Sequence, residues 1–150
     1  MKKIIICLIS IFLLVGCSAV EDKIYLTDKY YDNSNNSFQE IDEEKIKDLK
    51  DDTYMLYVFN SFCKFSIPCD SIFAEFMKNN NITIMSIPYD KYKKTDFVKK
   101  VKYAPTVIII HKNKIISYLD ADKDEDVNKY QDIEEFTNWV KEYIYLKNKK

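Results

Sequence analysis

Two cysteines lie between a strand pattern and a helix pattern, and this junction constrains the fold more than any other stretch. Residues 54–59 are aromatic and β-forming without polar alternation, which is typical of a central strand covered on both faces. Cys63 and Cys69 follow, and residues 72–77 then place apolar side chains at helical spacing. Unpaired backbone N–H groups at a helix start favour a thiolate. The junction therefore predicts two thiols where a strand ends and a helix begins.

The first residues have the anatomy of a secretory leader. A short positive region precedes residues 4–15, an almost unbroken apolar run that is too short to span a bilayer by itself. Residues 14–17, Leu-Val-Gly-Cys, resemble the bacterial lipoprotein box, in which the cysteine is lipidated and becomes the new N-terminus. We therefore expect residues 1–16 to be a lipoprotein signal peptide and Cys17 to carry the lipid. An ordinary signal peptide or an uncleaved anchor is the alternative.

This leader sets the expected location and the use of the cysteines. Diacyl anchoring supplies the two chains that stable membrane attachment needs, so we expect a lipid-anchored protein on the extracytoplasmic face of the cell membrane. Of the four cysteines, Cys7 leaves with the leader and Cys17 carries lipid. Cys63 and Cys69 remain in the folded part, in an environment that permits disulfides.

The rest of the chain alternates strand and helix patterns. We expect strands at residues 38–41, 54–59, 82–87, 107–110 and 115–119, and helices at residues 43–49, 67–78, 96–100 and 132–146. This order predicts an α/β domain with a mixed sheet and helices on both faces. Residues 17–37 form the lipidated N-terminus and tether, within which residues 24–31 fit a short strand or an ordered arm. Residues 38–150 form the domain.

Together these features resemble the thioredoxin superfamily. Residues 54–63 look like the strand that delivers the active-site cysteine, and residues 101–106 look like the segment that holds the family's cis-proline. The resemblance covers roughly residues 38–147 and implies a thioredoxin-like fold. It also implies that Ala104 and a cis Pro105 line a substrate groove facing the cysteines. The chain is most similar to small thioredoxin-like bacterial lipoproteins, such as bacteriocin-transport accessory proteins.

Two departures from the family pattern bear on activity. The family motif is C-x-x-C, whereas five residues separate Cys63 from Cys69 here. Matched from the helix, the motif places Ser66 at the nucleophile position, and Ser66 also fits the N-cap of the helix. Many thioredoxins carry a buried acid six residues before the first cysteine, where this chain has Tyr57. By analogy with family order, Cys63 attacks and Cys69 resolves, but the helix dipole also permits the reverse order.

The resemblance implies a thiol–disulfide oxidoreductase that uses Cys63 and Cys69. Its partners would be extracytoplasmic protein thiols or a membrane redox partner. The alternative is a non-catalytic thioredoxin-fold lipoprotein that binds a transporter or an exported peptide, with the two cysteines forming a structural disulfide. A position opposite Pro105 favours a redox-active pair.

Other candidate sites are weaker. His111, the single histidine, ends a strand before a turn, and we expect a surface role. Four aspartates between residues 120 and 126 alternate as in a calcium loop, but Glu125 replaces the required glycine, so we expect a solvated acidic turn. We expect no metal site and no cofactor. The formal net charge of −1 gives no electrostatic basis for nucleic-acid binding.

Overall fold

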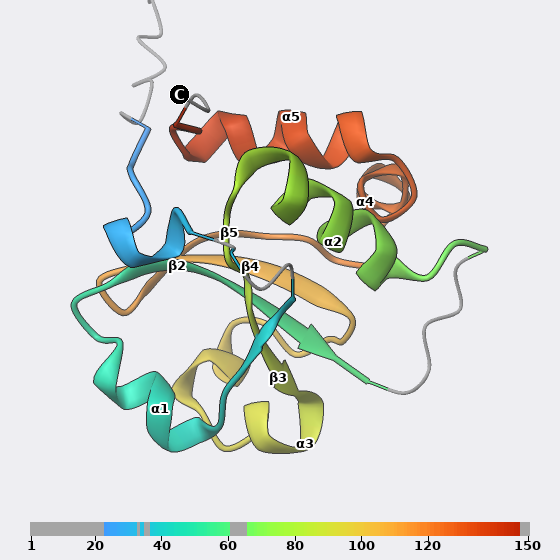
Figure 1. Cartoon of the computed structure of the whole chain (residues 1–150). Coiled ribbons are helices and arrows are strands. Elements are labelled where there is room, and N and C mark those ends of the chain that lie inside the picture. The colour runs from blue at the N-terminus through green and yellow to red at the C-terminus, as the bar shows by residue number, and fades with distance from the viewer. Residues whose placement is uncertain (1–22, 33, 35–36, 61–65, 148–150) are drawn as a thin grey trace, which may run out of the picture.

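A five-stranded mixed sheet forms the centre of the protein (Figure 1). The computed structural model describes residues 23–32, 34, 37–60 and 66–147. In spatial order the strands are β1, β3, β2, β4 and β5, where β1, β3 and β2 pair in parallel and β4 and β5 run antiparallel to their neighbours. Their bounds are β1 (Gln39–Glu40), β2 (Thr53–Phe59), β3 (Met85–Pro88), β4 (Thr106–His111) and β5 (Lys114–Tyr118).

Helices cover both faces of this sheet. The α-helices are α1 (Glu43–Asp48), α2 (Cys69–Asn80), α3 (Tyr89–Tyr92), α4 (Asp124–Val127) and α5 (Ile133–Tyr143), and the 3-10 helices are η1 (Asp28–Tyr30), η2 (Asp96–Lys99) and η3 (Asn128–Tyr130). Helices α2, α4 and α5 lie on one face, and α1 and α3 lie on the other (Figure 1). The predicted α/β class, with a mixed sheet between two helical layers, is confirmed.

Strand β2 is central and buried, as its composition predicts. It pairs with β3 on one side and with β4 on the other, and its residues from Thr53 to Val58 are buried. On the side of α2, the Tyr57 ring meets Phe73 edge-on at 5.1 Å between centroids, and Phe73 meets Phe136 of α5 at 4.7 Å. Burial of each such ring stabilises the fold by about 1.5–3 kcal/mol. These contacts hold the N-terminal half of α2 against the end of β2.

Helix α2 begins later than the Ser66 cap predicts. Its N-cap is Pro68, which has φ −57° and ψ 125° and provides no side-chain cap, so Cys69 is the first helical residue. The expected N-cap role of Ser66 is therefore wrong, because the extended backbone of Pro68 separates Ser66 from the helix. At the other end the helix continues to Asn80, past the expected end at residue 78, and Asn81 stops it in the left-handed conformation at φ 52°.

An N-terminal arm packs onto the sheet. The Ile24 amide donates to the Tyr143 carbonyl oxygen at 2.8 Å, and Ile24 forms a parallel bridge with Ile144. Leu26 and Tyr30 are both buried in the core. This segment is the ordered arm that we weighed for residues 24–31, so the packed part of the chain includes residues that precede position 38.

The remaining elements follow the predictions with local differences. The hairpin between β4 and β5 turns at Lys112 and Asn113, both of which have positive φ. The strand expected at residues 82–87 starts only at Met85. The backbone groups of the two preceding residues bond elsewhere: the Thr83 amide donates to Tyr30 of the N-terminal arm, and the Ile84 amide donates to the Met77 sulfur of α2. The Ile84 carbonyl oxygen accepts from Gln39 of β1. The helix expected at residues 96–100 is the 3-10 helix η2, and α3 was not predicted.

Candidate functional site

The candidate site lies where β2 ends and α2 begins. Cys69 is 1% exposed and disulfide-bonded, and it is the first residue of α2. It therefore lies in the first helical turn, as the sequence predicts. Cys63, the expected attacking thiol, and Cys17, the expected lipidation site, lie outside the described residues. The pairing of Cys63 with Cys69, the attacking role of Cys63 and the lipidation of Cys17 stay predictions.

The segment before β4 is joined to the end of β2. The Asn60 side-chain amide donates to the Ala104 carbonyl oxygen at 2.9 Å. The Ala104–Pro105 peptide bond is cis, which confirms the expectation that the family resemblance supplied. The buried Tyr130 donates its hydroxyl to the Pro105 carbonyl oxygen at 3.0 Å. Ala104 and Pro105 are thus held from two sides, by β2 and by η3.

A cavity of about 590 Å³ opens beside Cys69. Phe38, Tyr57 and Phe59 supply aromatic walls, with ring centroids 5.3 Å apart for Phe38 and Tyr57 and 5.9 Å apart for Tyr57 and Phe59. The other described residues that line the cavity are Ser37, Glu40, Asn60, Pro68, Cys69, Asp70 and Ser86. Sequence reasoning did not assign this cavity, although the alternation along β2 places Tyr57 and Phe59 on one face of the sheet.

Tyr57 occupies the position where many thioredoxins carry a buried acid. It is 7% exposed, and burial raises the pKa of its hydroxyl to about 12, with a smaller contribution from the negative charge of Asp70. The phenol is therefore protonated at neutral pH. A neutral phenol cannot take a proton as a carboxylate would.

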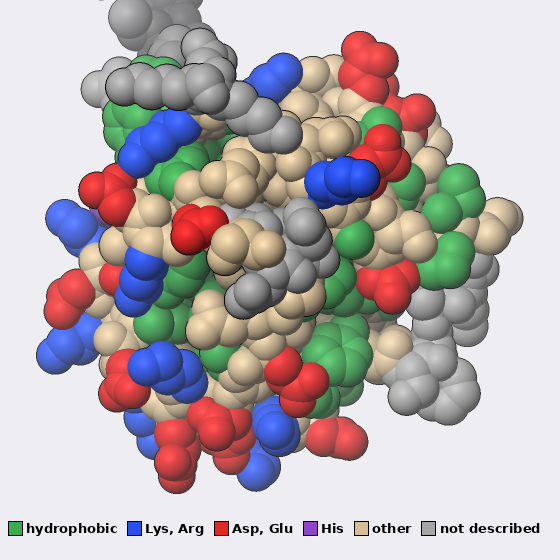
Figure 2. Space-filling view, in the orientation of Figure 1, with side chains coloured by type: hydrophobic (Ala, Val, Ile, Leu, Met, Phe, Trp, Pro, Cys, Tyr) green, Lys and Arg blue, Asp and Glu red, His purple; other side chains and the backbone are tan. Residues whose placement is uncertain are grey.

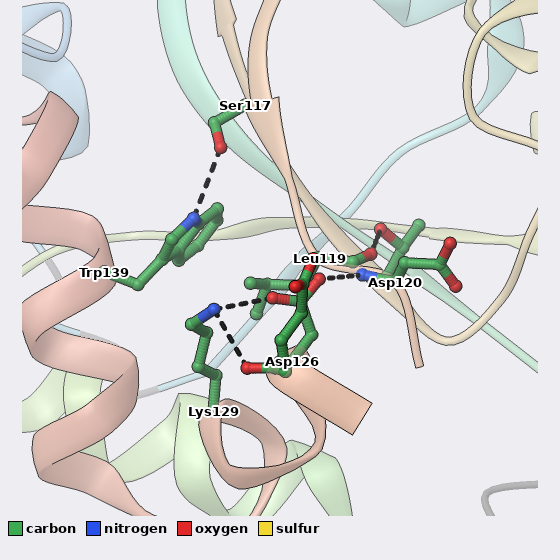
Figure 3. Close-up of polar contacts among 8 residues, drawn as sticks. Ser117, Leu119, Asp120, Asp126, Lys129 and Trp139 are labelled. Atoms are coloured by element: carbon green, nitrogen blue, oxygen red, sulfur yellow. Dashed lines mark hydrogen bonds and ion pairs between the residues drawn. The ribbon is translucent and has the colours of Figure 1, made fainter. Parts of the chain in front are cut away.

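Two aspartates of the acidic loop after β5 are buried, whereas Asp122 and Asp124 are exposed, as the predicted solvated turn requires. Asp120 and Asp126 are 6% and 8% exposed. The Asp126 carboxylate accepts from the Asp120 amide at 2.9 Å and from Lys129 Nζ at 2.6 Å (Figure 3). The predicted solvated turn is wrong for these two residues, because the Asp126 carboxylate is buried against the Asp120 amide and Lys129 Nζ, which donate to it. No group of residues in the described ranges could hold a metal ion.

This network supports the segment that carries Pro105. The Thr106 hydroxyl donates to the Leu119 carbonyl oxygen at 2.5 Å, one residue from Asp120. Burial and, to a smaller extent, the negative charge of Asp126 raise the pKa of Tyr130 well above its usual value, and its hydroxyl donates to the Pro105 carbonyl oxygen. The hydroxyls of Thr106 and Tyr130 therefore hold the segment that carries Pro105 at the start of β4.

His111, for which we expect a surface role, is the last residue of β4. Its Nδ1 lies 2.7 Å from the Thr53 hydroxyl, and this contact joins β4 to β2 at the end of their ladder. Lysine and acidic side chains are interspersed on the face shown in Figure 2 rather than gathered by sign. Among the residues that the structure describes, no helix is long and apolar enough to cross a membrane.

The strand order, the antiparallel β4–β5 hairpin and the two helical layers define a thioredoxin-like fold. Solved thioredoxins match the chain at low identity. The Schistosoma mansoni protein is 18% identical, with 73% of this chain and 97% of that chain covered and a TM-score of 0.49. The Plasmodium falciparum protein is 12% identical, with 67% and 98% covered and a TM-score of 0.49.

The Trypanosoma brucei brucei thioredoxin is 14% identical, with 79% of this chain and 99% of that chain covered and a TM-score of 0.46. No protein-family model and no curated protein matches the sequence. The fold class stands on the topology described above.

Proposed function

We propose that the protein is a membrane-anchored thiol–disulfide oxidoreductase that acts outside the cytoplasm through Cys63 and Cys69. The observation that carries this proposal is the position of Cys69, a buried and disulfide-bonded cysteine in the first turn of α2, beside a cavity. The positive end of the helix dipole stabilises a thiolate at this position. The lipoprotein box at Cys17 supports the anchor and the location.

The proposed reaction is disulfide exchange. The Cys63 thiolate attacks one sulfur of a substrate disulfide, and a mixed disulfide forms as the other substrate sulfur leaves and takes a proton from water. The Cys69 thiolate then attacks Cys63 and releases the second substrate thiol. The substrate gains two electrons and the pair is oxidised, so a second dithiol partner must reduce it again. Run backwards, the same steps oxidise a substrate dithiol.

The burial of Cys69 supports this order of attack. A sulfur in a residue that is 1% exposed has little access to a protein substrate, whereas a resolving sulfur needs access only to its own partner. We therefore assign attack to Cys63 and resolution to Cys69. In this proposal Ala104 and Pro105 line the substrate groove, where backbone groups pair with an extended peptide.

Trapping of a mixed disulfide tests the proposal. With Cys69→Ser, the complex between Cys63 and its substrate cannot be resolved, so covalent protein adducts should accumulate in cells and disappear on reduction. Cys63→Ser is the matched control and should trap none. If neither variant traps an adduct and both bind a transporter or exported peptide as the wild type does, the result would instead support the non-catalytic binding protein with a structural disulfide.

A further inference from the structure

The cavity beside Cys69 combines aromatic walls with acidic charge. Phe38, Tyr57 and Phe59 present ring surface, and Glu40 and Asp70 are the charged residues among the described lining. Both charges are negative, and none of the described residues that line the cavity is a lysine. Aromatic faces attract a cation because the ring quadrupole is negative above the ring. This composition selects a positively charged, partly apolar group.

The acidic groups lie on two different elements. Glu40 belongs to β1 and Asp70 to the first turn of α2. Lys91 approaches Glu40 only to 3.9 Å, and both side chains are largely exposed, so this ion pair is weak and exchangeable. The charge of Asp70 is felt inside the cavity, since it contributes to the raised pKa of Tyr57.

We propose that this cavity binds a lysine or arginine side chain of the protein substrate, close in sequence to the cysteine that reacts. The inference rests on the proposed oxidoreductase function, because Pro68 and Cys69 form one wall of the cavity. A basic side chain fits this site better than an apolar one, since its stem packs on the rings and its charged head meets the carboxylates. An acidic side chain would meet like charge from both carboxylates.

Matched peptides test this preference. Three peptides of equal length carry lysine, glutamine or glutamate next to a cysteine that is disulfide-bonded to 2-mercaptoethanol. The reduced full-length protein in detergent reduces each peptide, and each rate is divided by the rate with dithiothreitol to remove the peptide's own reactivity. We expect normalised rates about three- to tenfold higher for lysine than for glutamine, and lower for glutamate than for glutamine.

Variants locate the preference in the cavity. The double variant Glu40→Gln with Asp70→Asn should bring the lysine-to-glutamine ratio close to one. Glu44→Gln removes an exposed acid of α1 that does not line the cavity, and it should keep the wild-type ratio.

Failure of this inference differs from failure of the proposed function. Equal normalised rates for the three peptides with the wild type, or a ratio that persists in the double variant, would overturn the inference and leave the oxidoreductase function standing. No reduction of any peptide would overturn the oxidoreductase function and this substrate preference with it.

Discussion

The Asn60 side-chain amide donates to the Ala104 carbonyl oxygen at 2.9 Å, which links the end of β2 to the residue before Pro105. The two residues are 44 positions apart in sequence. Through this bond, the strand that leads to the cysteine segment also positions the predicted substrate groove.

Removal of this link should lower exchange activity more than stability. We expect Asn60→Ala to cost about 1 kcal/mol of unfolding free energy, which is typical of one hydrogen bond, and to slow disulfide exchange several-fold. Urea denaturation and a peptide-disulfide reduction assay measure the two effects.

Asn80→Ala is the matched control for Asn60→Ala. Its amide donates to the Phe76 carbonyl oxygen at the same distance, 2.9 Å, near the far end of α2. It should lose similar stability and keep wild-type exchange. Equal exchange rates for the two variants would contradict a positioning role for Asn60.

The acidic network should contribute far more to stability than a surface ion pair of the same geometry. Asp126–Lys129 and Asp96–Lys99 are both i,i+3 pairs at 2.6 Å, but the side chains are 11% and 23% exposed in the first pair and 90% and 79% in the second. We expect Asp126→Asn to cost about 1–3 kcal/mol, because it weakens buried, charge-assisted hydrogen bonds. Asp96→Asn should leave the urea midpoint unchanged. Similar midpoints for both variants would contradict the structural role of Asp126.

Buried tyrosines should make the fold sensitive to alkali. The folded state holds the Tyr57 proton more tightly than the unfolded chain, since its pKa is raised from 10.0 to about 12. This contribution to stability is fully present below pH 10 and is lost as the pH rises through about 12. Burial raises the pKa values of Tyr30, Tyr54 and Tyr92 in the same direction.

Urea denaturation between pH 8 and pH 11.5 checks this prediction. The unfolding free energy should fall above pH 10, and Tyr57→Phe should flatten part of that fall, by about 1 kcal/mol at the alkaline end. Tyr25→Phe changes a side chain that is 58% exposed and should keep the wild-type slope. A slope that is identical in Tyr57→Phe and the wild type would contradict the burial of this hydroxyl.

The fold was predictable because local patterns and topology agree. The unbroken apolar character of β2 indicated a central strand, and the helices expected at residues 43–49 and 132–146 lie close to the observed α1 and α5. Short elements were less predictable. Helix α3 has four residues, too few for an amphipathic period, and its burial depends on Tyr92, whose hydroxyl donates to the Val101 carbonyl oxygen.

The candidate site was predictable only in part. Sequence spacing placed Cys69 at a helix start and implied a cis Pro105. It did not reveal the cavity, because Phe38, Phe59 and Asp70 come together only when β1, β2 and α2 assemble. It also placed Asp126 in solvent, since an alternating acidic pattern gives no sign of the buried bonds to Asp120 and Lys129.

The reduction potential of the Cys63–Cys69 pair tests the central claim most directly. Equilibration of the full-length protein in glutathione buffers, with the free thiols counted by alkylation, gives this value. We predict a potential between about −270 and −120 mV, the range of exchange-active pairs, together with turnover of a protein disulfide. A potential well below about −300 mV with no turnover would show a structural disulfide and contradict the proposed activity.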